Sequence, residues 1–209
     1  MSKGDLTREH IVAKAAPIFN RSGFTGTSLS ELMEATGLQK GGIYRHFKNK
    51  EELAAAAFDH AWDRAWNARW TDIDRNANAI EQLKQFLANF VNNRADLVEG
   101  GCPMLNTAVD SDDGNPMLRD RARKALSRWL RRIQDIVRSG ITKGEIRNEI
   151  DPLATATVII STLEGALMIG RLQHSRSALQ HAREYLGNFL ESLATASLET
   201  SDTNWVSRR

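Results

Sequence analysis

Apolar residues recur at intervals of three and four along most of the chain, the spacing that places them on one face of an α-helix. The first such stripe includes Ile11 and Phe19 and predicts a helix from about Thr7, a good N-cap, to about Gly23. Pro17 lies inside this stretch and removes one helical hydrogen bond. We expect a bend there rather than a break, because the apolar stripe continues beyond the proline.

Further stretches show the same spacing between residues that cap or break helices. Their helices are expected at about 28–36, 39–47, 50–70, 77–98, a short segment after Pro103, 116–139, 152–173 and 177–198. Ser28 and Glu31 form a capping box, and Asp151 precedes a proline at a first helical position. Residues 158–160 alone resemble a strand, but the absence of nearby turn signals favours a long helix. The predicted fold class is therefore all-α, with about nine helices.

The second and third helices are short and joined by a turn at Gly37, which predicts a helix-turn-helix. The third contains Gly41 and Gly42, and each glycine costs a helix about 1 kcal/mol relative to alanine. Residues without side chains allow close approach of another surface, here a nucleic-acid backbone or base edges. Ile43 and Phe47 are four residues apart and should face inward.

The remaining residues of the third helix suit a DNA groove, because Lys40, Tyr44 and Arg45 can point outward as donors to phosphates and bases. Residues 1–50 carry eight Lys or Arg against four Asp or Glu, whereas residues 51–209 carry 20 against 22. The N-terminal residues 1–50, called the head below, are therefore basic, whereas the rest of the chain is weakly acidic. This uneven distribution of charge indicates that the head binds a polyanion. The alternative is a helical hairpin with an incidental basic, solvated face.

Composition narrows the class of protein further. The 209 residues are 41% hydrophobic and 26% charged, which excludes collagen-like and wholly disordered chains. The single cysteine, Cys102, excludes an internal disulfide and any multi-cysteine metal site, and the histidines show no metal-ligand spacing. We therefore expect no metal and no cofactor. No apolar leader follows the N-terminus, and Glu164 interrupts the apolar stretch 152–170, so we expect a cytoplasmic protein with no membrane partner.

Five segments near the N-terminus resemble, in order, spacing and residue type, the DNA-binding domain of the tetracycline-repressor (TetR) family. They are 7–11 (TREHI), 23–24 (GF), 27–29 (TSL), 37–38 (GL) and 40–53 (KGGIYRHFKNKEEL). The resemblance covers about residues 7–60, and Pro17 departs from the smoother first helix common in the family. It implies a three-helix DNA-binding domain over 1–50 and a helical effector-binding and dimerisation domain over 51–200. The polar residues 201–209 are expected to form a flexible tail.

The resemblance also implies roles for individual residues. Positions that contact phosphates in the family are occupied by Thr27, Ser28, Tyr44, His46 and Lys50. Positions that face bases or nearby phosphates are occupied by Gln39, Lys40, Gly41 and Arg45. The implied function is that of a ligand-responsive regulator and not an enzyme. The resemblance implies a homodimer that binds palindromic double-stranded operator DNA, represses transcription, and is released by a small-molecule effector.

Six aromatic residues are candidates to line an apolar effector pocket. They are Trp62, Trp66 and Trp70, at i, i+4 and i+8 on one helix face, together with Phe86, Phe90 and Trp129. The alternative is that this stripe is ordinary hydrophobic core. Its position favours a pocket, because the fourth helix connects directly to the DNA-binding head. A ligand that moves this helix changes the spacing of the two heads of a dimer.

The last two long helices resemble the family's dimer interface, a four-helix bundle across a two-fold axis. The candidates to be buried there, or alternatively in the monomer core, are Leu163, Ala166, Leu167, Tyr185, Phe189 and Leu193. A symmetric dimer places its two recognition helices one DNA turn apart, roughly 34–36 Å.

Cys102 supports a second regulatory hypothesis, because it precedes a helix start that would lower the pKa of its thiol. The protein is then a thiol-based sensor of oxidants or electrophiles, whereas the alternative is a cysteine that is simply a small buried hydrophobe. The remaining classes are a helical adaptor without DNA binding and an enzyme that uses Cys102 or Glu164. Against the enzyme, the sequence contains no nucleophile elbow, phosphate loop or metal motif.

Overall fold

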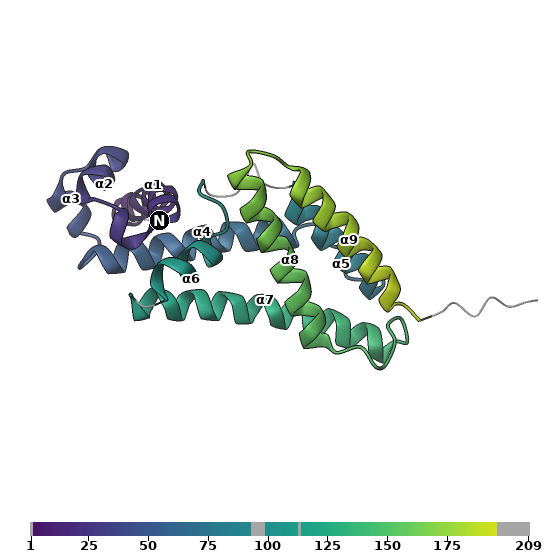
Figure 1. Cartoon of the computed structure of the whole chain (residues 1–209). Helices are drawn as coiled ribbons and strands as arrows, with labels where there is room; N and C mark the ends of the chain where they lie inside the picture. The colour runs from purple at the N-terminus through teal and green to yellow at the C-terminus, as the bar shows by residue number, and fades with distance from the viewer. Residues whose placement is uncertain (1, 93–98, 113, 196–209) are drawn as a thin grey trace, which may run out of the picture.

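The computed structural model describes residues 2–92, 99–112 and 114–195, and this part of the chain is all-α (Figure 1). Its nine helices are α1 (Lys3–Gly26), α2 (Leu29–Thr36), α3 (Lys40–Tyr44), α4 (Lys50–Trp70), α5 (Ala79–Asn92), α6 (Pro103–Ser111), α7 (Pro116–Thr142), α8 (Pro152–Leu172) and α9 (Ser177–Leu193). An isolated antiparallel bridge joins Ile146 to Ala194. The predicted fold class is confirmed.

The first helix begins earlier than its apolar stripe predicts. Ser2 is the N-cap and forms a capping box with Asp5, whereas the hydroxyl of Thr7 donates to the Lys3 carbonyl at 3.0 Å. Helical dihedral angles continue through Pro17 and are left only at Gly23, where φ is 71°. Glycine adopts this left-handed conformation without a steric penalty, and one more turn then leads to the end of α1.

The helix-turn-helix is present, but its second helix is shorter than the predicted 39–47. Ser28 caps α2 by accepting from the Glu31 backbone N–H, and it donates to the Glu31 carboxylate, which lowers the pKa of that carboxyl group. Gly37 ends α2 with φ of 69°. After Tyr44 the chain tightens, since His46 N–H bonds to the carbonyl only three residues before it. Two glycines in a five-residue helix leave little to sustain further turns.

Other helix ends shift for local reasons. The predicted α7 end at 139 extends to Thr142, whose hydroxyl donates to the Arg138 carbonyl. The predicted α9 end at 198 is wrong, because Ala194 is extended and bridges to Ile146. The predicted end of α5 and the proposed tail 201–209 lie outside the described residues.

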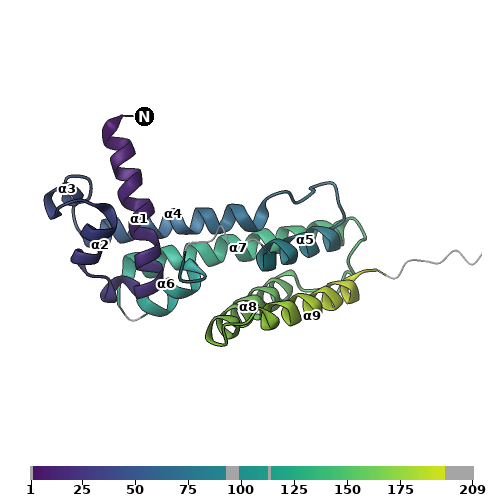
Figure 2. The same ribbon diagram turned by 90° about the horizontal axis from the view of Figure 1, so that it is seen from above.

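The described helices enclose two large hydrophobic cores, and α4 contributes to both. The first lies among α1, α2, α3 and the first half of α4 and includes Ile11, Leu32 and Phe47, all fully buried. The second lies among the rest of α4 and α5 to α9, with Trp129 and Leu163 fully buried. Figure 2 shows α1, α2 and α3 gathered at one end of the molecule, from which α4 runs alongside α7.

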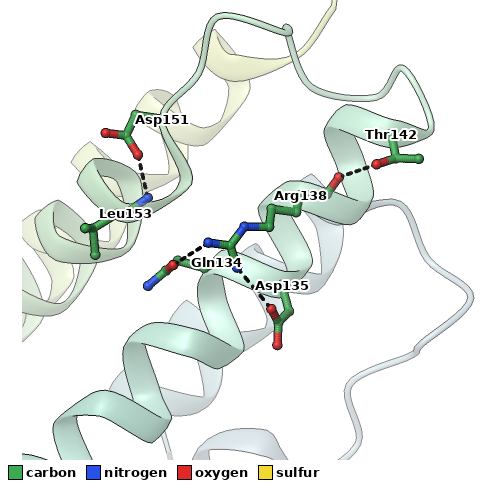
Figure 3. Close-up of polar contacts among 6 residues, drawn as sticks. All are labelled: Gln134, Asp135, Arg138, Thr142, Asp151 and Leu153. Atoms are coloured by element: carbon green, nitrogen blue, oxygen red, sulfur yellow. Dashed lines mark hydrogen bonds and ion pairs between the residues drawn. The ribbon is translucent and has the colours of Figure 1, made fainter.

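Polar side chains stabilise the end of α7 and the start of α8 (Figure 3). Asp151 is the predicted N-cap of α8, and its Oδ1 accepts the Leu153 backbone N–H at 2.8 Å. Near the end of α7, Arg138 donates to Gln134 Oε1 at 2.8 Å and pairs with Asp135 at 3.3 Å, both on the same helix. The cap at Asp151 therefore fixes where α8 begins, and the contacts of Arg138 support the last turns of α7.

Among the described residues α8 is the one helix long and apolar enough to cross a membrane, with a mean hydropathy of 1.6. The expectation that this stretch falls short of a membrane span is therefore wrong as regards length and composition. Half of its apolar window is buried inside the molecule, where Leu163 and Leu167 belong to the second core. Its outer side carries the exposed residues Met168, Ile169 and Leu172.

Candidate functional site

The end of the molecule formed by α2, α3 and the start of α4 carries the predicted DNA contacts (Figure 2). Ile43 and Phe47 are buried in the first core, as predicted. The residues predicted to face bases are all exposed: Gln39, Lys40, Gly41 and Arg45. Of the predicted phosphate contacts, Ser28 is exposed, Tyr44, His46 and Lys50 are half-buried, and Thr27 is buried.

The two glycines of α3 differ in their surroundings. A Cβ placed on Gly41 would meet no other atom within 4 Å, whereas one on Gly42 would lie 3.4 Å from the Leu38 Cβ. Packing within this chain therefore does not require a glycine at position 41. The missing side chain leaves an exposed stretch of backbone that another molecule can approach closely.

Two predicted phosphate-contacting side chains are bonded within the head itself. The Thr27 hydroxyl donates to the Gly23 carbonyl at 2.7 Å. Lys50 Nζ donates to the Phe24 carbonyl and lies 4.6 Å from the centroid of the Phe24 ring. These contacts hold the turn between α1 and α2 against the start of α4, a role that sequence reasoning missed.

A buried hydrogen-bond network joins the head to α6. Asn20 Nδ2 donates to the backbone carbonyls of Glu99 and Gly101, at 2.9 and 3.1 Å, and Asn106 Nδ2 donates to the Asn20 carbonyl at 2.9 Å. Gly100 has φ of 110°, and a Cβ there would lie 2.9 Å from the Asn20 main chain. Only glycine fits this close approach. The consecutive glycines Gly100 and Gly101 are therefore the feature of the sequence that could have indicated this contact between the head and α6.

The six aromatic residues predicted to line a pocket come together in the second core. They are Trp62, Trp66, Trp70, Phe86, Phe90 and Trp129, with contacting ring centroids 4.6 to 6.4 Å apart. Trp66 and Trp70 are half-buried, and Arg128 and Arg132 of α7 lie over their rings. The rings pack on one another as core residues do, and their contact with an effector stays a prediction.

Sequence reasoning missed Arg69, which lies among these rings and is 2% exposed. Its guanidinium carbon is 4.4 Å from the Trp129 ring centroid and 4.6 Å from that of Phe90. Glu164 of α8 is the neighbouring carboxylate, with 3.9 Å between Arg69 Nη2 and Glu164 Oε1. The available signal was that Arg69 lies seven residues after Trp62, on the same helix face.

Cys102 lies next to this pair, and the pKa of its thiol is not lowered as its position at a helix start alone would suggest. It is the N-cap residue of α6 and is 1% exposed. Burial, together with the nearby Glu164 carboxylate, raises the pKa of the thiol to about 12. The expectation of a lowered thiol pKa is wrong, because desolvation outweighs the favourable helix end.

The predicted dimer residues divide into two groups. Leu163, Ala166, Leu167 and Leu193 are buried in the second core of the single chain, as their alternative interpretation holds. Tyr185 is 65% exposed and Phe189 is half-buried. The outer side of α8 adds a row of exposed apolar side chains that sequence reasoning did not select: Leu153, Val158, Met168, Ile169 and Leu172.

Comparisons with known proteins cover both parts of the chain. Residues 11–57 match the family described as bacterial regulatory proteins, tetR family. Residues 79–186 match the family described as tetracyclin repressor-like, C-terminal domain.

Whole-chain relatives agree with these matches. A TetR transcriptional regulator from Chloroflexus aurantiacus is 44% identical in its crystal structure, with a TM-score of 0.88, over 93% of this chain and 98% of that one. A TetR-family regulator from Cytophaga hutchinsonii is 34% identical, with a TM-score of 0.87, over 94% and 99%. The transcriptional repressor DhaR from Mycobacterium sp. is 23% identical over 93% of this chain and 94% of its own length. The chain therefore belongs to the TetR family of ligand-responsive, DNA-binding transcriptional regulators.

Proposed function

We propose that the protein is a cytoplasmic homodimeric repressor that binds a palindromic double-stranded operator and is released by a small-molecule effector. One observation carries this proposal: the segment 39–47, which contains α3, buries Ile43 and Phe47 while it exposes a polar, basic side at one end of the molecule. Residues 1–50 form the DNA-binding domain in this proposal, and residues 51–200 form the effector-binding and dimerisation domain, followed by a tail over 201–209.

Base recognition is assigned to the exposed side of α3. Lys40 and Arg45 offer donors of the kind that read guanine in the major groove, and Gln39 suits adenine. Gly41 lets the backbone approach the DNA, in agreement with the open space around it. These four residues would therefore set which sequence is bound.

Phosphate contacts fix the register of the head on the duplex. Tyr44 and His46 present a hydroxyl and an imidazole at the edge of α3, and Ser28 lies at the N-terminus of α2, where backbone N–H groups favour an anion. Thr27 would contribute through its backbone, because its hydroxyl hydrogen is already bonded within the head. Lys50 donates one N–H to the Phe24 carbonyl, and its charge and remaining N–H groups would serve a phosphate.

Dimerisation is assigned to α8 and α9. The exposed row of apolar residues on α8 and the exposed Tyr185 on α9 provide a surface that gains from burial against a second copy. A two-fold axis through this surface gives the isologous contact usual in homodimers. The same axis explains a palindromic operator, since each head reads one half-site.

A salt titration of binding to DNA fragments upstream of the gene and its neighbours tests the proposal. Binding should weaken linearly on a log–log plot against salt, and Lys40→Ala, which removes a proposed base contact, should weaken operator binding by about 1–3 kcal/mol and relax the sequence preference. The matched control is Lys143→Ala, which removes an exposed lysine at the far end of α7. The proposal fails if no fragment binds in a salt-dependent manner, or if both substitutions weaken binding equally.

A further inference from the structure

Arg69 and Glu164 form a buried ion pair whose hydrogen bonds are not made. The side chains are 2% and 8% exposed, and the shortest distance between them, 3.9 Å, is too long for a hydrogen bond. Among the described residues, none of the three guanidinium nitrogens of Arg69 has a hydrogen-bond partner. Glu164 makes no hydrogen bond to Arg69, and its polar neighbour on the other side is the Cys102 thiol. Within the described part of the chain, the core therefore contains a charged guanidinium whose donors are not used.

A buried guanidinium whose N–H donors are not used is unfavourable unless an acceptor binds to them. A guanidinium stays protonated at every physiological pH, so Arg69 cannot escape the cost of burial by losing its charge. Buried donors in folded proteins nearly always have partners, and each exception asks for an explanation. The missing component here is an acceptor, and an effector that enters the second core would supply one.

The surrounding rings restrict how an acceptor can reach Arg69. Trp129, Phe90 and Trp62 lie 4.4, 4.6 and 5.9 Å from the guanidinium carbon, and cation–π contacts with these neighbouring rings occupy one side of it. The N–H groups point outward in the guanidinium plane, so the edge of the group is what a partner can use. A carboxylate matches that edge, since its two oxygens accept two parallel hydrogen bonds.

Donors outnumber acceptors in this cluster. Besides Arg69, the indole nitrogens of Trp70 and Trp129 are buried without a partner among the described residues, whereas the acceptors that face Arg69 are the carboxyl oxygens of Glu164. Burial raises the pKa of the Glu164 carboxyl group. In its protonated form that group donates a hydrogen bond and does not repel an anion. The local chemistry therefore favours a ligand rich in acceptors over a cationic one.

We propose that Arg69 and Glu164, within the cluster of Trp62, Phe90 and Trp129, form the head-group subsite for the effector, and that this effector is an apolar molecule carrying a carboxylate or an equivalent oxyanion. The inference rests on the proposed ligand-released function and adds the chemical class of the ligand. The oxyanion binds the edge of Arg69, and the apolar body replaces aromatic contacts of the second core.

The same subsite is connected to the DNA-binding head. Arg69 belongs to α4, whose first half packs in the first core. Cys102, beside Glu164, directly follows the glycine pair whose second member accepts a hydrogen bond from Asn20 of α1. An anion that draws Arg69 and Glu164 into new positions thus acts on two elements that hold the head in place.

Calorimetric titration of the full chain with three probes that share one phenyl ring tests the ligand class. They are phenylacetate, 2-phenylethanol and 2-phenylethylammonium, each taken to millimolar concentration in the absence of DNA. Phenylacetate should bind roughly 10- to 150-fold more tightly than the alcohol, the difference expected for a hydrogen bond to a charged group. The ammonium compound should bind most weakly.

Paired variants locate the interaction. Arg69→Met combined with Glu164→Leu removes both charges at similar volume, a change that folded proteins tolerate, and it should abolish the preference for phenylacetate. Arg69→Lys keeps the charge without the planar fork and should retain only part of the preference. Operator binding without ligand, measured alongside, reports on the proposed function separately from the subsite.

Three outcomes overturn the inference: no binding of phenylacetate by the folded protein, tighter binding of the ammonium compound, or an unchanged preference in the double variant. If operator binding is normal in each of these cases, the repressor function stands and only the ligand class is wrong. If operator binding fails while phenylacetate binds through Arg69, the subsite stands and the proposed function is wrong.

Discussion

The two members of the buried Arg69–Glu164 pair should respond very differently to removal. Glu164→Leu leaves a permanent positive charge in a buried site, where no other carboxylate of residues 2–92, 99–112 or 114–195 is bonded to Arg69. Arg69→Met leaves a carboxyl group that can become neutral by binding a proton. The perturbations are close in volume, so the difference between them reports on charge rather than on packing.

The expected magnitudes follow from this asymmetry. Breaking a buried pair so that one charge remains costs about 3–5 kcal/mol, which we expect for Glu164→Leu at every pH. Burial places the folded-state pKa of Glu164 above its unfolded value. The native state of the Arg69→Met variant therefore holds the proton more tightly, and its stability is greatest below the unfolded pKa of about 4.3 and falls as pH rises through the folded pKa. The double variant should be as stable as the unaltered protein or more so.

Urea denaturation followed by circular dichroism measures all three free energies of unfolding, at a fixed protein concentration because a dimer's stability depends on it. Circular dichroism is preferable to fluorescence here, since three tryptophans contact or adjoin the altered site. Equal losses for the two single variants at neutral and acidic pH would refute the reasoning. So would a double variant whose loss equals the sum of the single losses.

Three further predictions concern other parts of the molecule. Gly23→Ala should destabilise the fold by roughly 1 kcal/mol or more, because Gly23 has φ of 71° and an added Cβ would clash with a carboxylate of α6. The control Gly4→Ala, in the same helix, should be neutral or stabilising. Thermal unfolding compares the two variants, and equal melting temperatures would contradict the prediction. Because its thiol pKa is raised to about 12, Cys102 should react with a chromogenic disulfide reagent only after denaturation, and rapid labelling of the native protein at neutral pH would instead favour the thiol-sensor alternative. Leu172→Arg, on the exposed side of α8, should shift the protein toward monomer in analytical ultracentrifugation, whereas Val109→Arg, at a similarly exposed position on α6, should not. If the Leu172→Arg variant stays dimeric, the interface lies elsewhere.

Local signals account for most of what the sequence predicts correctly. The caps Ser28, Asn49 and Asp151 act through atoms within a few residues of each other, so their helix starts follow directly from the sequence. The inward position of Ile43 follows from helical spacing, whereas Phe47 is buried as predicted although α3 ends at Tyr44. By contrast, the early end of α9 depends on a bridge to a residue far away in the chain, which spacing does not encode.

The candidate site was predictable only in part, because the missing features depend on what surrounds a residue in three dimensions. Arg69 follows the apolar stripe of α4, yet an arginine in a helix is usually at the surface, and only the packing of α5, α7 and α8 shows it to be buried. The pKa of Cys102 likewise follows from enclosure and not from its neighbours in sequence. Leu163 and Leu167 are apolar whichever side they face, and only the fold shows that they belong to the core.

The continuity of α4 determines how far a small movement is amplified. Its 21 residues form one rigid rod about 31 Å long, with Arg69 near one end and the head's first core at the other. A tilt of about 5° about the effector end displaces the opposite end by about 3 Å, close to the rise of about 3.4 Å between stacked bases. In the proposed effector response, a lever of this length would convert a small adjustment around a buried side chain into a loss of register between the two proposed half-sites.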